Sequence, residues 1–388
     1  MNMHQITIEQ IPRLINEGNI NFIGEAVTPW HAHGIDCAIK YLKANNVIVK
    51  GLILIKPALK EGKIHYILDE NNFVNDCCDY AQSATRFNTK LWFLLKQQVS
   101  RVLATSKYNH QDFNNRQLVY IASPWHLDLN LFIALHKHLH RTHIFRLMMV
   151  EEGLSTYFPA VNTFRHIWEV NAMKKRGVRM ISSFLLQSSD KILQQRFERK
   201  TEWINLNLLK RDLNNLKENV AATSLYKEVI SEFEQNMGIS NVLPNLNGVI
   251  LICTMAYLTS EIKENNDVKT LKAIVDELQR QGKRVFLKPH PREADYKKRY
   301  ASLGCEFIDT PCSVESVLVS NPNIQAIISF SSTALITAKL LFKIKAISII
   351  NLLDMDMYGA YIQDEMRSFI ECFSSLVDMP KNLSELKV

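Results

Sequence analysis

The chain has 388 residues, of which 47% are hydrophobic and 22% are charged, with a net charge of +7. This composition excludes a disordered protein, and the length fits two domains. No apolar run is long enough for a membrane span, and residues 1–5 do not resemble a signal peptide. Seven scattered cysteines without C-x-x-C spacing favour a reducing compartment. We therefore expect a cytoplasmic protein, at most peripheral on the inner membrane, without nucleic acid as a partner.

The first part of the chain alternates apolar strands with helices. We expect strands at residues 21–24, 47–55, 118–122 and 144–150, and a loop at 28–34 that precedes a helix at 35–44. The unbroken Val/Ile/Leu content of the second run is typical of a strand buried on both faces. This alternation predicts an α/β fold with a doubly wound parallel sheet. Residues 165–235, in contrast, suggest an insertion of long, charged helices.

A second alternating series follows a turn at residues 238–248. Strands are expected at 249–253, 284–287, 306–308 and 326–329, and helices at 268–281, 313–319 and 333–341. We therefore predict two Rossmann-like domains, residues 1–240 and 241–365, with a helical segment at 366–388 that returns to the N-terminal domain. Ligands of such domains bind at the carboxyl ends of the strands.

Two glutamates and a glycine follow the strand predicted at 144–150. Glu151 and Glu152 are adjacent, so on an extended backbone they point in opposite directions and only one faces a ligand. Gly153 permits a turn that a side chain would obstruct. The triplet also fits an acidic helix start, where carboxylates favour the helix dipole.

The strand predicted at 284–287 leads into the sequence Lys288-Pro289-His290-Pro291-Arg292. The prolines restrict the backbone on both sides of His290 and so hold its imidazole in a defined direction. A histidine can donate a proton to a leaving phosphate near neutral pH, and Lys288 or Arg292 could add positive charge. The alternative is a rigid turn with an incidental histidine.

The strand predicted at 326–329 passes into a helix through Ser331, Ser332 and Thr333. Their hydroxyl and amide groups can converge on a phosphate at the start of the helix. A simple helix cap is the alternative. The glycines and lysine of a P-loop are missing, which disfavours nucleotide hydrolysis.

In this order, E-E-G, K-P-H-P-R-E and S-S-T resemble the motifs of bacterial sialyltransferases: acidic-acidic-glycine, H-P and S-S/T. Residues 150–157 and 286–293 are most similar to the capsular polysialyltransferases of glycosyltransferase family 38. The resemblance implies a GT-B fold, in which two Rossmann-like domains face each other across a cleft. It also implies inverting transfer from CMP-sialic acid, with no cofactor and no bound metal.

The resemblance further assigns roles by position. Glu152 would be the general base, with Glu151 and Gly153 supporting it, and His290 would be the general acid. The predicted donor-binding residues are Ser331, Ser332, Thr333, Glu315, Lys288, Pro291 and Thr254. Glu315 matches an acidic position that binds the nucleotide ribose, and His126 matches a histidine of the donor or acceptor pocket. His31 and His33, in the loop expected at 28–34, are candidates for the acceptor side.

These observations predict an enzyme that elongates a polysialic acid capsule chain. Its partners would be CMP-sialic acid, an anionic acceptor and, at the inner membrane, the capsule-export complex. Three alternatives stay open. The first is a monosialyltransferase acting on lipooligosaccharide. The second is another GT-B enzyme, such as a nucleotide-sugar 2-epimerase or a transferase with a different CMP-sugar. The third is a non-catalytic protein that binds a polyanion or a sugar nucleotide.

Overall fold

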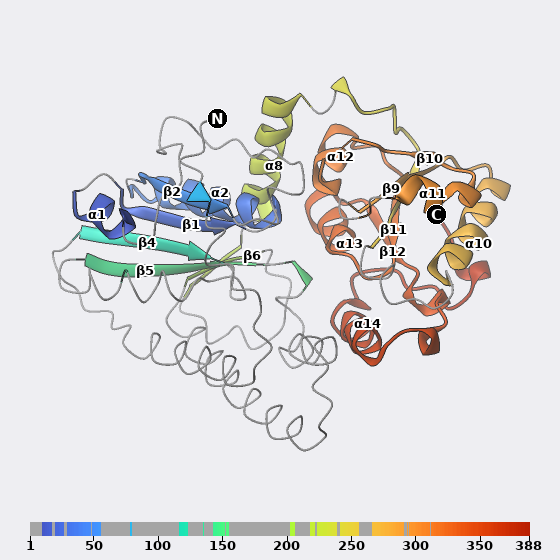
Figure 1. The fold of residues 1–388 in the computed structure, drawn as a ribbon. Helices are drawn as coiled ribbons and strands as arrows, with labels where there is room; N and C mark the ends of the chain where they lie inside the picture. Colours follow the sequence, from blue (N-terminus) through green and yellow to red (C-terminus); the bar gives the residue numbers. More distant parts are fainter. Residues whose placement is uncertain are drawn as a thin grey trace, which may run out of the picture. The chain divides into compact units, whose positions relative to one another are not determined.

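The protein divides into two compact α/β units in a computed structural model (Figure 1). The first comprises Met1–Thr156 and Thr163–Leu225, and the second comprises Tyr157–Asn162 and Tyr226–Val388. The structure describes residues 10–17, 20–26, 29–47, 49–55, 78–79, 116–122, 135, 143–151, 153–154, 202–205, 218–221, 223–238, 241–255, 266–290, 293, 295–310 and 312–388. The prediction of two Rossmann-like units is confirmed.

The first unit is built on a seven-stranded sheet of parallel strands in the order β3-β2-β1-β4-β5-β6-β7. Its strands are β1 (Phe22–Ala26), β2 (Gly51–Ile55), β3 (Cys78–Asp79), β4 (Arg116–Ala122), β5 (His143–Val150), β6 (Glu202–Asn205) and β7 (Glu218–Ala221). The short helix α1 (Gln10–Asn16) precedes β1, and α2 (Pro29–Ala44) follows it. Helix α2 packs closely on β1, since a Cβ atom at Gly24 would lie 3.1 Å from the Ile35 side chain.

Two sequence expectations for this unit are wrong. The region expected to be helical at 165–235 contains β6 and β7. These four-residue strands take their conformation from pairing next to β5, because runs as short and polar as EWIN and ENVA carry little strand signal of their own. The loop expected at 28–34 is instead the start of α2. Pro29 opens that helix, a position where its missing amide hydrogen costs nothing.

The second unit contains a five-stranded parallel sheet in the order β10-β9-β8-β11-β12. Its strands are β8 (Ile250–Cys253), β9 (Val285–Lys288), β10 (Glu306–Phe307), β11 (Ala326–Ser329) and β12 (Lys345–Ser348), and its helices are α8 (Thr223–Met237), α10 (Asn266–Arg280), α11 (Tyr296–Arg299), α12 (Val314–Ser320), α13 (Thr333–Thr337) and α14 (Ala360–Phe373). Helix α8 begins within the first unit. Apolar residues of α10 at helical spacing, Val268, Leu271 and Val275 among them, are buried. A π-helical turn, Ala338–Phe342, continues α13.

The end of the chain belongs to the second unit. Asp378 exchanges backbone hydrogen bonds with Ala346 and Ser348 of β12, and Phe369 and Phe373 of α14 are buried against each other. The expected return of residues 366–388 to the N-terminal domain stays a prediction. The division between the units falls at residue 226, near the start of α8, which runs on as one helix to Met237.

Candidate active site

The H-P and S-S/T motifs lie at neighbouring strand ends of the second sheet. Strand β8 lies between β9, which leads into His290, and β11, which leads into Ser331. The two residues after β8 contact one motif each. Thr254 accepts a hydrogen bond from the amide of His290 at 2.9 Å, and the thioether of Met255 lies 3.2 Å from the amide of Ser331. Both motifs therefore meet at the carboxyl end of β8.

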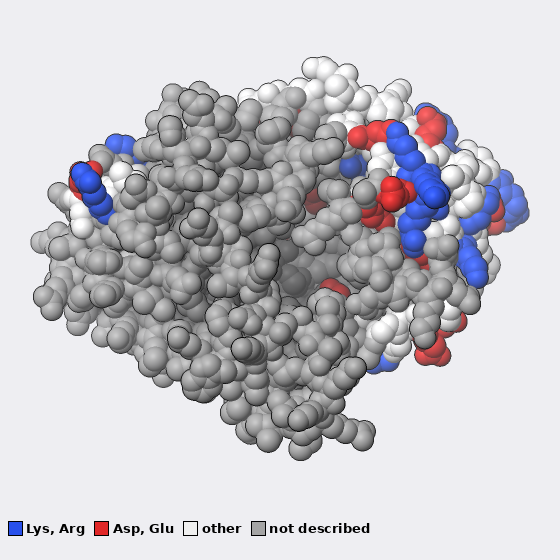
Figure 2. Space-filling model, in the orientation of Figure 1, with Lys and Arg blue, Asp and Glu red and all other residues white. Residues whose placement is uncertain are grey.

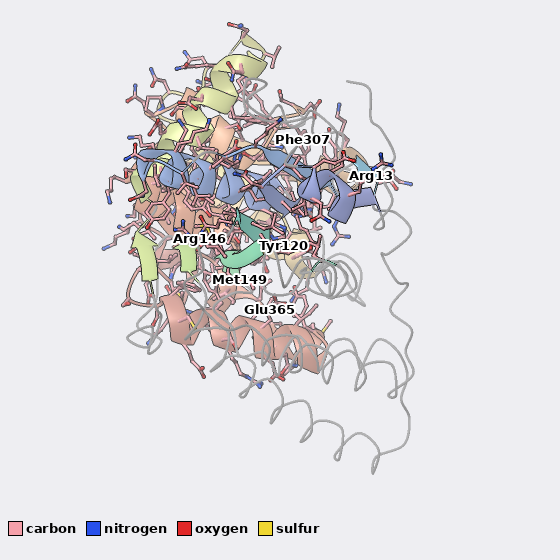
Figure 3. The ribbon with its side chains drawn as sticks, turned by 90° about the vertical axis from the view of Figure 1, so that its left-hand side faces the viewer. Arg13, Tyr120, Arg146, Met149, Phe307 and Glu365 are labelled. Atoms are coloured by element: carbon pink, nitrogen blue, oxygen red, sulfur yellow. The ribbon has the colours of Figure 1, made fainter. Side chains whose placement is uncertain are left out.

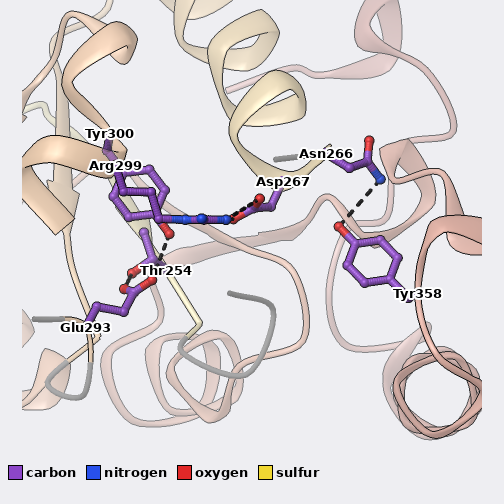
Figure 4. Close-up of polar contacts among 7 residues, drawn as sticks. All are labelled: Thr254, Asn266, Asp267, Glu293, Arg299, Tyr300 and Tyr358. Carbon is purple, nitrogen blue, oxygen red and sulfur yellow. Dashed lines mark hydrogen bonds and ion pairs between the residues drawn. The ribbon is translucent and has the colours of Figure 1, made fainter. Parts of the chain in front are cut away.

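A buried carboxylate fixes the backbone of the H-P turn. The Glu293 Oε2 accepts from the His290 amide at 3.0 Å and from the Thr254 hydroxyl, while the amide of Glu293 bonds back to the His290 carbonyl at 2.9 Å. Tyr300 donates its hydroxyl to Oε1 at 2.8 Å. Figure 4 shows Glu293 between Thr254 and Tyr300. The side chain of His290 is half-buried, whereas Glu293 is buried.

An ion pair ties this turn to the neighbouring helices. Arg299, next to Tyr300, forms two hydrogen bonds with the buried carboxylate of Asp267, at 2.7 and 2.8 Å (Figure 4). Asp267 lies in the first turn of α10, and Asn266 beside it reaches the Tyr358 hydroxyl at 3.5 Å. The ion pair thus fixes the segment that carries Tyr300, whereas Thr254 and Tyr300 contact the turn itself.

Lys288 points into the interior rather than into solvent. Its ammonium group donates to the Thr310 carbonyl at 3.2 Å, and only 4% of the residue is exposed. Burial lowers the pKa of Lys288, although the nearby groups of Cys312, Cys253, Asp309 and Glu315 oppose this shift. Burial also raises the pKa of the Cys253 thiol to about 12, which keeps that thiol neutral. A role of Lys288 in donor binding stays a prediction.

The three hydroxyl residues of the S-S/T motif differ in their surroundings. Ser331 is buried and its hydroxyl lies 3.8 Å from the Met255 sulfur. Ser332 is the N-cap of α13, where its hydroxyl accepts from the Ala334 amide at 3.2 Å, and Thr333 is the half-buried first residue of that helix. The capping role that the sequence left open is therefore real for Ser332.

Glu315 lies in the first turn of α12, beneath the helix that follows the S-S/T motif. Its carboxylate accepts from the Thr337 hydroxyl at 2.9 Å, and burial raises its pKa. Ser313, the N-cap of α12, and Lys288 act in the opposite direction on this pKa. The contact joins α12 to α13, so Glu315 helps to fix the turn that carries Ser331 and Ser332.

The E-E-G motif follows β5 in the first unit. Glu151 is fully buried directly after the strand, and Gly153 has a φ of +85°, a conformation that only glycine adopts readily. The structure therefore agrees with the turn expected at Gly153. Glu152, the predicted base, lies outside the described residues, as do His126 and Pro291.

The two histidine candidates for the acceptor side are buried in α2. His31 is 2% exposed and His33 is 1% exposed. Burial lowers the pKa of His33 to about 4, so its imidazole is neutral at physiological pH. Because they lie on a helix within the core of the first unit, they do not occupy the exposed loop that the sequence suggested.

One buried acid of the first unit was not predicted from the sequence. Glu25 lies in β1 and accepts a hydrogen bond from the hydroxyl of Tyr120 in β4. The paired register of β1, β4 and β5 places both residues on the face that also carries Met149, and Figure 3 shows Tyr120 and Met149 on adjacent strands. An acidic residue inside an apolar strand was the signal that could have pointed to it.

The described residues contain no group of three or more histidine, cysteine or carboxylate side chains arranged to hold a metal ion. Among the same residues, no helix combines the length and the apolar character that crossing a membrane requires.

Two Rossmann-like units, with the H-P and S-S/T turns meeting at one sheet edge, are the architecture of a GT-B glycosyltransferase. The sequence narrows this class further. The family described as alpha-2,8-polysialyltransferase (POLYST) matches residues 27–351, so the chain belongs to the alpha-2,8-polysialyltransferase family and is a sialyltransferase.

Several solved structures are similar to the chain over most of its length. The α/β-galactoside α-2,3-sialyltransferase of Photobacterium phosphoreum is 13% identical, with 94% of this chain and 98% of that chain covered and a TM-score of 0.46. A sialyltransferase from Photobacterium damsela is 12% identical, with coverages of 92% and 81% and a TM-score of 0.48. The UDP-GlcNAc 2-epimerase of Methanocaldococcus jannaschii is 13% identical, with 93% of each chain covered and a TM-score of 0.44. These similarities leave reaction and substrate open. No curated protein sequence matches the chain significantly.

Proposed function

We propose that the protein elongates a polysialic acid capsule chain by inverting, metal-independent transfer of sialic acid from CMP-sialic acid. The observation that carries the proposal is the meeting of the H-P and S-S/T turns at the end of β8, through Thr254 and Met255. This arrangement supports a donor site in which one histidine and two serines bind the same leaving phosphate. The description of the family supports a 2,8 linkage as part of this proposal.

In the proposed reaction the acceptor hydroxyl attacks the anomeric carbon and loses its proton to the Glu152 carboxylate. The bond from that carbon to the phosphate oxygen of CMP breaks, and its electron pair remains on that oxygen. His290 donates a proton or a hydrogen bond to the phosphate, and the hydroxyl and amide groups of Ser331 and Ser332 bind it. Attack from the face opposite the leaving group inverts the anomeric configuration.

Metal independence follows from the charge of the leaving group. CMP carries less negative charge than a nucleoside diphosphate, so one histidine together with hydroxyl and amide donors can stabilise its departure. The anionic acceptor accords with the net charge of +7. We further propose that the enzyme acts as a peripheral protein at the inner membrane, with the capsule-export complex.

The first prediction concerns the predicted acid and base. With CMP-sialic acid and a short sialylated acceptor, Glu152→Gln and His290→Ala should each lower the transfer rate at least about 1,000-fold. Both variants should keep the wild-type melting temperature, since one removes only a charge and the other a half-buried ring. CMP release, product length on a gel and the anomeric configuration by NMR are the readouts, with and without EDTA.

Each rival function gives a different result in this assay. A single added sugar would indicate a monosialyltransferase, and CMP binding without release from any CMP-sugar would indicate a non-catalytic protein. Near-normal turnover of either variant would contradict the assigned chemistry. Loss of wild-type activity with EDTA, restored by a divalent cation, would contradict metal independence.

A further inference from the structure

Glu293 has both carboxylate oxygens engaged within the second unit. One oxygen accepts from the Tyr300 hydroxyl, and the other accepts from the His290 amide and from the Thr254 hydroxyl. Thr254 itself accepts from the same His290 amide. Three donors from three segments therefore converge on a carboxylate that is 9% exposed.

Tyr300, one of the hydrogen-bond donors to Glu293, is itself held in place. Burial, the charge of Glu293 and the hydrogen bond to it raise the pKa of Tyr300, so its hydroxyl stays a donor across the physiological range. Arg299 lies over the Tyr300 ring, with its Cζ atom 5.6 Å from the ring centroid, and is paired with Asp267. The segment that carries the tyrosine is therefore held by an ion pair as well.

We propose that Glu293 is a positioning residue for His290, and that Tyr300 and Thr254 hold it in place. The inference rests on the proposed function, in which His290 assists the departure of CMP. Pro289 removes one amide from the backbone before the histidine, so the His290 amide is the first one available to anchor this turn. By binding that amide, the carboxylate fixes the backbone position from which the His290 imidazole extends. It does so without touching the substrate.

This role differs from general stabilisation of the fold. Small errors in the placement of a catalytic group reduce the rate steeply, whereas the affinity for a substrate held by other contacts changes little. Loss of an anchor on the His290 amide should therefore lower kcat while KM for the donor stays near its original value. A purely structural contact would instead lower the melting temperature without a selective effect on kcat.

The protein offers a matched pair of tyrosines for the test. Tyr300→Phe removes the hydroxyl that donates to Glu293, and Tyr358→Phe removes a hydroxyl that contacts Asn266 at the far end of the same cluster. Both rings are buried, and each variant loses one oxygen. We expect Tyr300→Phe to lower kcat about tenfold, with KM changed less than about twofold, and Tyr358→Phe to leave both nearly unchanged.

A second variant addresses the carboxylate directly. Glu293→Gln keeps the shape of the side chain but replaces one acceptor oxygen with an NH2 donor. It should lower kcat at least as much as Tyr300→Phe, and Glu293→Ala should lower it further. If Glu293→Ala fails to fold, Tyr300→Phe and its control Tyr358→Phe still test the positioning role, since each of them removes only a hydroxyl oxygen.

The NMR signal of the His290 imidazole provides a readout that does not depend on activity. The signal is assigned by its loss in His290→Gln. It should shift or broaden in Tyr300→Phe and stay in place in Tyr358→Phe. Equal effects of the two tyrosine variants, or a fall in kcat with an unmoved imidazole signal, would overturn the positioning role. A wild-type enzyme without transfer activity would instead overturn the proposed function, and the NMR comparison alone would then decide on Glu293.

Discussion

At the scale of single residues, burial sets the protonation states in this protein. The neutral His33 imidazole lies in the core of the first unit, and the pKa values of Lys288 and Glu315 in the second are shifted towards their neutral forms. Desolvation is the largest cause in all three cases, because a charged group loses its hydration when it is buried. For Lys288 and Glu315, nearby groups of opposite charge offset part of this cost.

His33 predicts a pH dependence of stability. Its pKa is about 4 in the folded protein and about 6.5 when unfolded, so the unfolded state binds the proton more tightly. Its contribution to stability is complete above about pH 6.5 and decreases as the pH falls towards 4, by up to roughly 3 kcal/mol. Urea unfolding of the first unit, followed between about pH 7 and pH 5, should show this decrease in the wild type and a smaller one in His33→Gln.

The control for this prediction is His290→Gln, which changes a half-buried histidine of the second unit. Because His290 lies in the other unit, unfolding of the first unit should keep its wild-type slope of stability against pH. Equal slopes for His33→Gln and the wild type would show that His33 does not titrate in this range.

At the scale of elements, side-chain contacts between segments fix the turns that carry the motifs. Arg299 and Asp267 join α11 to α10, and Glu315 and Thr337 join α12 to α13. The helices α11, α12 and α13 are each shorter than two turns, so their own hydrogen bonds stabilise them little. Their conformation depends on these contacts and on the caps Ser313 and Ser332.

Two aspartates of α10 give a stability prediction. Asp267→Asn breaks a pair in which one guanidinium nitrogen of the half-buried Arg299 donates to both carboxylate oxygens, and it should lower the free energy of unfolding of the second unit by about 2 kcal/mol. Asp276→Asn alters an exposed pair with Lys272 in the same helix and should change it little. Urea unfolding of both variants checks this, and equal losses would contradict the importance assigned to the buried pair.

At the scale of the whole molecule, positive charge is not concentrated on the face of the second unit that Figure 2 shows. Basic and acidic side chains are intermixed on its face in Figure 2, and several of its lysines and arginines pair with carboxylates, such as Lys297 with Asp309 and Arg280 with Glu277. Paired surface charges contribute little to binding a polyanion. We therefore attribute the proposed attraction of an anionic acceptor to the net charge of the whole chain, +7, rather than to these paired charges.

This attraction predicts a salt effect that grows with acceptor length. Between about 0.05 and 0.3 M NaCl the screening length shortens, so KM for a long polysialic acid acceptor should rise more than KM for a short one. Initial rates with size-selected acceptors measure this, and kcat with saturating short acceptor serves as the control. An equal rise for both acceptors would argue against long-range attraction of the chain.

The sequence by itself determined the α/β class, four of the strands of each sheet and the positions of the three motifs, because unbroken apolar runs and strand-end signatures are local. It also indicated correctly that Gly153 forms a turn. Only the tertiary structure decided that residues 202–205 and 218–221 are strands, since pairing next to β5 rather than local propensity makes them so. The burial of His31 and His33 and the anchoring of His290 by Glu293 and Thr254 depended on it too. Those contacts join residues far apart in the chain, such as Thr254 and Glu293, and a linear pattern does not encode which distant groups the parallel sheet brings to the same edge.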